Sequence, residues 1–197
     1  MPTTLAVHYE QSNQALKGET VIMGIDPGSQ ITGVGVIKVC GQDLTHIYSE
    51  SIKLPKGDLS RRLQQIYARL QVIIAQTRPS VAAIEKVFLA KNPQSALVLG
   101  HARGAAVLAA VNNELALSEY SATEIKKTVV GRGRADKTQV QHMMRILLNL
   151  QHTPDVDASD ALAAAVCHAH HQQIQSAVKQ ASAVKVKRKT ISKRRVT

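Results

Sequence analysis

Residues 20–39, TVIMGIDPGSQITGVGVIKV, contain the pattern of two successive β-strands. The first seven, Thr20–Asp26, form a short apolar run that is typical of a buried β-strand. The next three, PGS (27–29), are residue types that favour a turn. Residues 31–39 then alternate and are rich in β-branched side chains, which predicts a second strand. Because the link between the two runs is short, we expect an antiparallel hairpin.

After residue 39, the sequence predicts one more strand of this sheet and then alternating helices and strands. Residues 44–54 follow a second turn and predict a third strand, again antiparallel. Apolar residues at helical spacing after Asp58 predict a helix that ends at Pro79. The run 81–85 predicts a strand parallel to the first, because a helical crossover connects them. Further elements are expected as a helix over 93–113, a strand over 115–120, and helices near 122–130, 136–150 and 156–172. This order predicts an α/β domain with a mixed five-stranded sheet flanked by helices.

The positive charge is concentrated at the C-terminal end. The chain has 25 Lys and Arg against 14 Asp and Glu, a formal charge of +11, yet eight basic residues and no acidic ones lie within 179–197. Such a segment attracts polyanions by counterion release, without sequence selectivity; a merely solubilising end is the alternative. A length of 197 residues fits one domain. We expect a flexible N-terminal extension (1–19), a folded domain (20–173) and a disordered basic tail (174–197).

Composition argues against several classes of protein. Two cysteines, Cys40 and Cys167, are too few for a disulfide framework or a cysteine-based zinc module, and they predict a reducing, cytoplasmic location. The apolar stretches fall short of the roughly 20 residues of a membrane span, and no secretory signal precedes the domain, so no membrane partner is expected. There is no P-loop motif, and Gly33-Val-Gly35 lacks the third glycine of a dinucleotide fingerprint.

Acidic residues follow two of the predicted strands at the point where each strand ends. Asp26 comes after VIMGI, and Glu85 comes after VAAI. If these strands are parallel neighbours, both carboxylates emerge at the edge of the sheet where α/β proteins place ligands. Neighbouring carboxylates raise each other's pKa unless a cation lies between them. Oxygen ligands of this kind suit hard divalent cations.

Two further acids lie in DVDASDALAAAV (155–166), where Asp157 and Asp160 share one face near the start of a predicted helix. Four carboxylates converging on one point suit a two-metal site that stabilises the attacking and leaving oxygens at phosphorus. Each acid also has an ordinary interpretation: Asp26 as a turn residue, Glu85 as a solvated strand end, and Asp157 as a helix cap. The functional interpretation gains weight because three separate segments each place an acid at the expected end of an element.

Four stretches, in unbroken order, resemble the RuvC family of bacterial Holliday junction resolvases. They are GIDPGSQITGVGVI (24–37), AIEKVFLAKNPQSALVLGHARGA (83–105), IKKTVVGRGRADKTQVQHMM (125–144) and DVDASDALAAAVCHAH (155–170). The resemblance implies a ribonuclease H-like fold. It also implies a Mg²⁺-dependent crossover junction endodeoxyribonuclease that nicks two strands of like polarity symmetrically, in homologous recombination and DNA repair, and leaves 5′-phosphate ends.

The resemblance also implies roles for single residues. The family's four catalytic acids fall on Asp26, Glu85, Asp157 and Asp160. These acids would hold two Mg²⁺ ions, with Mn²⁺ as a substitute. The implied DNA contacts are Phe88, which would stack on a base near the crossover, Lys126 and Lys137 near the site, and, as a hypothesis for extra phosphate contacts, Arg132 and Arg134.

The implied partners are a four-way DNA junction, a second copy of the chain and the RuvAB branch-migration complex. The helix over 93–113 resembles the family's dimer interface, where Ala96, Gly100 and Gly104 would allow close helix packing. Internal packing within one subunit is the alternative interpretation of these small residues. A two-fold dimer would match the near-two-fold symmetry of a four-way junction.

Two other functions stay open at this point. A non-catalytic junction-binding protein would use the acids only to orient DNA, although the presence of all four acids argues against it. An actin-like or sugar-kinase-like phosphotransferase shares the opening GID-x-G strand and turn, but it needs two such domains, for which this chain is too short. The histidines at 168, 170 and 171 cannot all face one way on a helix, so we expect a packing or phosphate-proximal role for one of them.

Overall fold

The computed structural model describes residues 18–86 and 93–194, with side chains described up to residue 178 and at residue 182. Its five strands are β1 (Glu19–Asp26), β2 (Ile31–Cys40), β3 (Asp43–Lys53), β4 (Val81–Glu85) and β5 (Ala116–Tyr120). They form one sheet in the order β3-β2-β1-β4-β5. β1, β2 and β3 are antiparallel neighbours, whereas β4 is parallel to β1 and β5 is parallel to β4. The predicted mixed five-stranded sheet, with its two hairpins and its parallel crossover, is confirmed.

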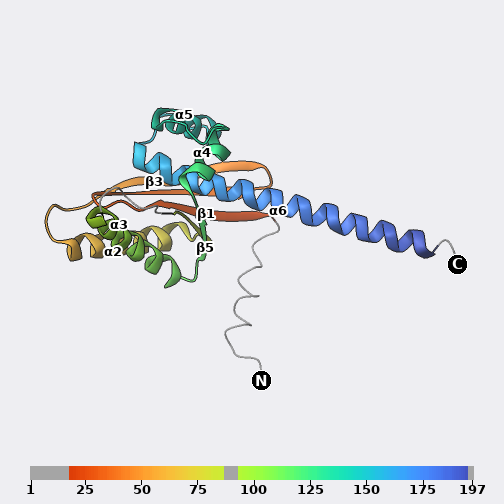
Figure 1. Ribbon diagram of the computed structural model, residues 1–197, viewed down its shortest axis with the longest axis horizontal. Helices are drawn as coiled ribbons and strands as arrows, with labels where there is room; N and C mark the ends of the chain where they lie inside the picture. Colours follow the sequence, from red (N-terminus) through yellow and green to blue (C-terminus); the bar gives the residue numbers. More distant parts are fainter. Residues whose placement is uncertain (1–17, 87–92, 195–197) are drawn as a thin grey trace, which may run out of the picture.

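Helices cover both faces of this sheet (Figure 1). One face is covered by α2 (Leu59–Thr77) and α3 (Pro93–Val111), which pack with the sheet in one buried cluster. The other face is covered by α6 (Val156–Arg194), with α4 (Ala122–Val130) and α5 (Lys137–Leu147) packed outside it. The sheet therefore lies between two helical layers, each with its own hydrophobic core.

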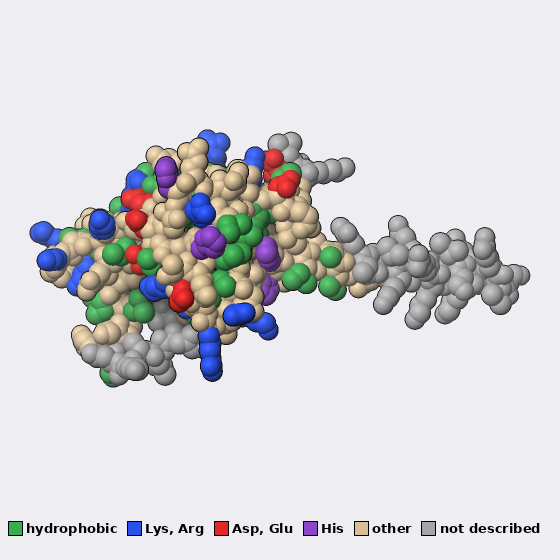
Figure 2. Space-filling model, turned by 90° about the horizontal axis from the view of Figure 1, so that it is seen from above, with side chains coloured by type: hydrophobic (Ala, Val, Ile, Leu, Met, Phe, Trp, Pro, Cys, Tyr) green, Lys and Arg blue, Asp and Glu red, His purple; other side chains and the backbone are tan. Residues whose placement is uncertain are grey.

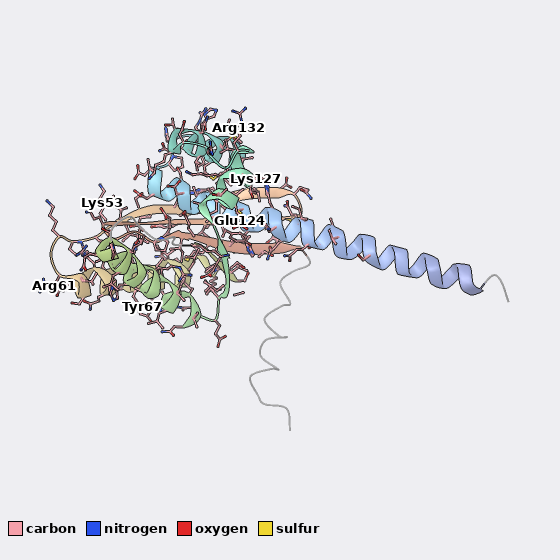
Figure 3. The ribbon with its side chains drawn as sticks, in the orientation of Figure 1. Lys53, Arg61, Tyr67, Glu124, Lys127 and Arg132 are labelled. Atoms are coloured by element: carbon pink, nitrogen blue, oxygen red, sulfur yellow. The ribbon has the colours of Figure 1, made fainter. Side chains whose placement is uncertain are left out.

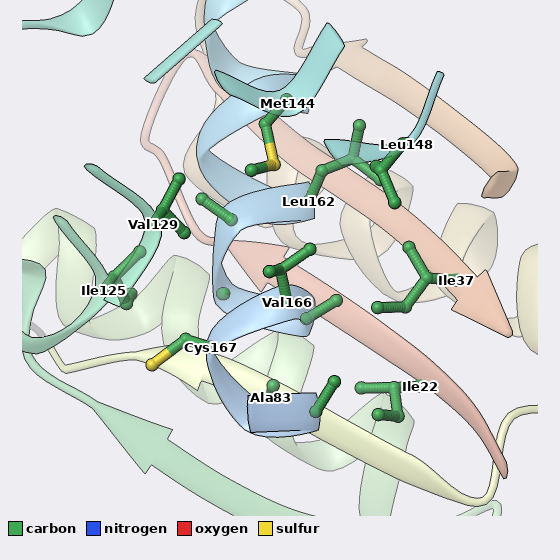
Figure 4. Packing of buried hydrophobic residues seen from close by; sticks show 14 of the residues in the cluster. Ile22, Ile37, Ala83, Ile125, Val129, Met144, Leu148, Leu162, Val166 and Cys167 are labelled. Carbon is green, nitrogen blue, oxygen red and sulfur yellow. The ribbon is translucent and has the colours of Figure 1, made fainter. Parts of the chain in front are cut away.

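The period-two alternation of β1 divides its side chains between the two cores. Met23 and Ile25 face the α2 and α3 layer, whereas Ile22 faces α6. Figure 4 shows Ile22 of β1, with Leu162 and Val166 of α6, in this second core. Because Asp26 lies two and four residues beyond Gly24 and Ile22, its side chain emerges on the same face as α6.

The helices that flank the site begin at strong local signals. Ser121 and Glu124 form a reciprocal capping box at the start of α4, and Asp136 and Gln139 form another at the start of α5. Each such cap contributes about 0.5–2 kcal/mol to helix stability. These caps fix where the first turns of α4 and α5 lie, and hence where their lysines are carried.

Two features differ from the sequence-based expectations. α6 does not end near residue 172, as expected, but continues as helix to Arg194 (Figure 1). α3 has the length and apolar composition that could cross a membrane, although no apolar stretch was expected to suffice. A single helix of this kind is weak evidence for a membrane span, and one side of α3 buries alanines against the sheet and α2.

Candidate active site

The two strand-end acids lie side by side at one edge of the sheet. In the parallel pair of β1 and β4, Ile25 is the register partner of Ile84. The next residues, Asp26 and Glu85, are therefore neighbours across the two strands, with side chains on the face that α6 covers. This is the arrangement that the sequence predicted for these two carboxylates.

Glycines in β1 and β2 bring the acidic end of α6 onto this edge. Gly33 is the register partner of Asp26, and a Cβ atom on Gly33 would collide with the backbone carbonyl of Asp157. One step along the sheet, a Cβ atom on Gly24 would collide with the backbone carbonyl of Ala161. The backbone of α6 thus lies directly on the two strands, and only glycine permits this approach. The backbone of Asp157 therefore lies over Gly33, which is the neighbour of Asp26 in the sheet.

The carboxyl groups are close enough to act on one another electrostatically. Burial, followed by the charges of Glu85, Asp160 and Asp157, raises the pKa of Asp26 to about 7. Burial likewise raises the pKa of Glu85, with the Asp160 charge as the next cause. Burial also raises the pKa of Asp160, although Lys137 and Lys126 oppose the shift. Acids from three separate segments therefore share one partly desolvated, anionic site, while their catalytic roles stay predictions.

Two lysines from the outer helices lie beside this anionic site. The Nζ atom of Lys137, the first residue of α5, is 3.8 Å from Oδ2 of Asp160. Lys137 is 66% exposed and Asp160 is 20% exposed, so the pair contributes little to stability. Lys126 of α4 lowers the pKa values of Glu85 and Asp160, as Lys137 does. Both lysines are thus near the acids and still reachable from solvent, as a phosphate contact requires.

The other predicted DNA contacts are not gathered at the acids. Arg132 and Arg134 are exposed in the link between α4 and α5, and Figure 3 shows Arg132 on the outer side of the helices, away from the sheet. Phe88 lies outside the described residues. Figure 2 shows Lys and Arg side chains scattered over one face of the body rather than collected in one patch.

The donor set fits a divalent cation in its chemistry. All four candidate ligands are carboxylates, and burial and neighbouring negative charge disfavour the ionised forms of Asp26, Glu85 and Asp160. Within residues 18–86 and 93–194, however, no three His, Cys, Asp or Glu side chains lie close enough together to form a ready metal cluster.

A buried histidine next to the site was only partly anticipated. His168 of α6 is 7% exposed, and its Nδ1 atom is 2.8 Å from the hydroxyl of Tyr120. Burial lowers the pKa of His168 to about 4, so its ring is neutral near pH 7. Tyr120 is the register partner of Glu85 at the end of β5. The pair therefore ties α6 to the strand beside Glu85, which fits the expected packing role for one histidine.

A mixed sheet of this order, with acids at the ends of β1 and β4 and at the start of the helix that crosses them, defines the ribonuclease H-like class of nucleases. The comparison with known families is more specific. Residues 22–168 match the family model described as crossover junction endodeoxyribonuclease RuvC, and the chain belongs to this family. The family and the fold class that the sequence predicted are thereby confirmed.

Curated relatives and solved structures agree with this assignment. The crossover junction endodeoxyribonuclease RuvC of Cronobacter sakazakii is 54% identical over 154 residues, which cover 78% of this chain and 89% of the relative. The protein of the same name from Pectobacterium atrosepticum is 53% identical over 154 residues, covering 78% and 91%. Thermus thermophilus RuvC superposes with a TM-score of 0.71 at 31% identity, covering 79% of this chain and 96% of that one. The same protein in complex with a Holliday junction substrate gives a TM-score of 0.74, with the same identity and coverage.

Proposed function

We propose that this chain is a metal-dependent endonuclease that resolves Holliday junctions by nicking two strands of like polarity at symmetric points. RuvC-family nucleases are metal-dependent, and a solved T. thermophilus member carries a Holliday junction substrate. The observation that carries the proposal is the electrostatic coupling of Asp26 to Glu85, Asp157 and Asp160, which come from three segments of the chain. Homologous recombination and DNA repair are the processes that such cleavage serves.

We infer that the four carboxylates hold two Mg²⁺ ions, with Mn²⁺ as a substitute. Metal ions bound there would supply activation of water and charge stabilisation at the leaving 3′ oxygen. The chain's own contribution is a site that is partly closed to water and rich in negative charge. Because the pKa of Asp26 is about 7 without a cation, Asp26 holds a proton for part of the time near neutral pH and loses it when positive charge arrives.

Lysines and one aromatic residue are the proposed DNA contacts. Lys137 and Lys126 place positive charge beside the acids, where it would attract the scissile phosphate and offset its negative charge. Arg132 and Arg134 would add phosphate contacts further out on the α4–α5 link. Phe88, three residues after Glu85, would stack on a base near the crossover, a contact that contributes about 1–3 kcal/mol per base.

A homodimer is the proposed working form, with α3 as its interface. Leu97, Leu108 and Val111 are 56%, 53% and 53% exposed on α3. Gly100 and Gly104 share the same helix face at spacings of three or four residues, and nothing lies within 4 Å of a Cβ atom built on either. The opposite face buries alanines in the core. An apolar face with small residues at its centre fits a second copy of the same helix.

We also propose the RuvAB branch-migration complex as a partner and the cytoplasm as the location. The first follows from the family resemblance. The second is supported by Cys40 and Cys167, which are both free thiols, since the exposed Cys40 suits a reducing compartment.

A comparison of DNA substrates tests the proposal. A synthetic four-way junction and a linear duplex of the same sequence are each incubated with the full chain, with and without Mg²⁺. We expect paired nicks with 5′-phosphate ends in the junction only, and only with the metal. Junction binding without nicks in either Mg²⁺ or Mn²⁺ would favour the non-catalytic alternative, and equal nicking of both substrates would contradict junction resolution.

A further inference from the structure

The turn that follows Asp26 is held by a side chain of α2, on the face of the sheet opposite to α6. Arg62 lies in the first turn of α2, and its Nη1 atom donates a hydrogen bond of 2.9 Å to the carbonyl of Ser29. Its Nη2 atom donates a bond of 3.0 Å to the carbonyl of Gly57 in the loop before α2. One guanidinium group therefore joins the β1–β2 turn, which begins at Asp26, to the loop that leads out of β3.

Hydrogen bonds within and next to the turn also hold its backbone. Thr32 is fully buried, and its hydroxyl donates to the carbonyl of Gly28 at 3.2 Å and accepts from the Gly28 amide at 3.4 Å. The Leu54 amide donates to the Gln30 carbonyl at 2.9 Å. These contacts give the turn one defined shape, and Arg62 connects that shape to α2.

The contacts of Arg62 are those of a clamp on the backbone rather than of a surface charge. Both terminal nitrogens bind carbonyl oxygens, and within the described residues the guanidinium makes no ion pair. Its Nε atom is buried without a hydrogen-bond partner among those residues, which costs free energy. A lysine has a single terminal nitrogen and cannot reproduce the planar fork that spans the two carbonyls.

We propose that Arg62 is a positioning residue for strand cleavage. By fixing the β1–β2 turn, it fixes the end of β1, and hence the placement of Asp26 against Glu85 and Asp157. Arg62 does not touch the reacting atoms; it acts through the turn. The inference rests on the proposed nuclease function, which the comparison of junction and duplex substrates tests separately.

The test compares Arg62→Gln and Arg62→Lys with the matched control Arg61→Gln, which changes the neighbouring, exposed arginine (Figure 3). Three quantities are measured on the full chain: kcat at saturating junction, the Kd for the junction in Ca²⁺, and amide hydrogen exchange at Leu54 and Leu148. For Arg62→Gln we expect kcat to fall about 10- to 100-fold, as for other supporting residues of active sites. The Kd should stay within about twofold, because the clamp does not contact DNA.

Hydrogen exchange separates local positioning from general stability. The Leu54 amide should lose protection in Arg62→Gln, whereas the Leu148 amide, bonded to the Met144 carbonyl near the end of α5, should keep it. Arg62→Lys should be intermediate in kcat, and Arg61→Gln should match the wild type. Wild-type kcat in Arg62→Gln, or equal loss of protection at both amides, would overturn the inference. If the wild type itself does not nick junctions, the nuclease proposal fails instead, while exchange at Leu54 still reports whether Arg62 holds the turn.

Discussion

Asp26 is a carboxyl group whose surroundings disfavour its ionised form. Its pKa of about 7, against an ordinary value of 3.8, comes first from burial and then from the charges of Glu85, Asp160 and Asp157. Between these two values the folded chain binds a proton that the unfolded chain has released. The ionised group therefore costs folding free energy, and this cost grows as the pH rises through that range.

Replacing Asp26 by Asn should stabilise the metal-free protein above neutral pH. In denaturant unfolding at pH 8 with EDTA, we expect Asp26→Asn to raise the free energy of unfolding by roughly 2–4 kcal/mol, since one pKa unit corresponds to about 1.4 kcal/mol. The gain should shrink steadily between pH 7 and pH 4, where the native group is already protonated. A variant no more stable than the wild type at pH 8 would show that Asp26 is not under electrostatic strain.

Only part of this site could be predicted from the sequence. Asp26 and Glu85 were predictable because each follows an apolar strand, and the carboxyl ends of parallel neighbours meet at one edge. The sequence interpretation used Gly33 only to dismiss a dinucleotide fingerprint, whereas its actual role is to admit the carbonyl of Asp157. No local sequence pattern indicates that contact, because it joins residues more than 100 positions apart. The contact of Arg62 with Ser29, 33 positions away, was missed as well, because no local pattern indicates it.

α6 carries two of the four acids, so its seating on the sheet determines the geometry of the site. Gly24 and Gly35 are register partners on neighbouring strands, and both lie under α6. A Cβ atom on Gly35 would come within 2.6 Å of the Leu162 side chain. The helix is held there by apolar contacts that include Leu162 and Val166 (Figure 4). A side chain under the helix would therefore move the acids and the core together.

Gly33→Ala should displace the start of α6. Its new methyl group would press on the Asp157 carbonyl, and overpacking of this kind typically costs about 1–3 kcal/mol. We expect a lower unfolding free energy together with a junction-cleavage rate reduced at least tenfold, measured well below the unfolding midpoint. Gly24→Ala, which presses on Ala161 instead, is the comparison variant and should be destabilised as well. Wild-type stability and activity in Gly33→Ala would contradict the close seating of α6.

Most elements were predictable because their signals are local. The strands have apolar or alternating runs, and α4 and α5 begin at capping boxes. The end of α6 was not predictable, because no proline or glycine follows residue 172 to terminate it. A helix can continue past the domain that it packs on.

At the scale of the whole molecule, the exposed face of α3 is the proposed interface of a two-fold symmetric dimer. Replacing Leu108 by Lys should place a charge in the helix–helix contact and shift the protein from dimer to monomer, as measured by sedimentation. The matched control is Ile146→Lys on α5, where a 54% exposed side chain lies off the proposed interface. Leu108→Lys should also uncouple the two nicks, so that single-nicked junctions accumulate. A variant that sediments like the wild type would contradict the assignment of the interface.

The basic end of α6 lies far from the acids. The helix has 39 residues and is therefore about 58 Å long. Its acids are near the first turn, whereas Gln173 binds the Gly41 carbonyl at 2.9 Å in the β2–β3 turn, at the other end of the strands. Positive charge beyond residue 178 would thus meet DNA at a distance from the cleavage point.

Deleting residues 179–197 should weaken binding to every DNA while leaving the chemistry intact. We expect lower affinity for both junction and duplex, and a shallower dependence of log K on log salt by about 0.9 for each lost phosphate contact with duplex DNA. The kcat at saturating junction should not change. Unchanged affinity and salt slope would leave the tail as a solubilising end.

The most direct test of a shared carboxylate site is cleavage by single variants that each remove one charge from a different segment. Asp26→Asn, Glu85→Gln and Asp160→Asn are assayed on a four-way junction in Mg²⁺, with junction binding measured in parallel in Ca²⁺. Loss of several kcal/mol of charge stabilisation predicts at least about a 100-fold lower cleavage rate for each variant, with junction affinity retained. Wild-type cleavage by any one of the three would contradict the account, because the acids would then not act as one site.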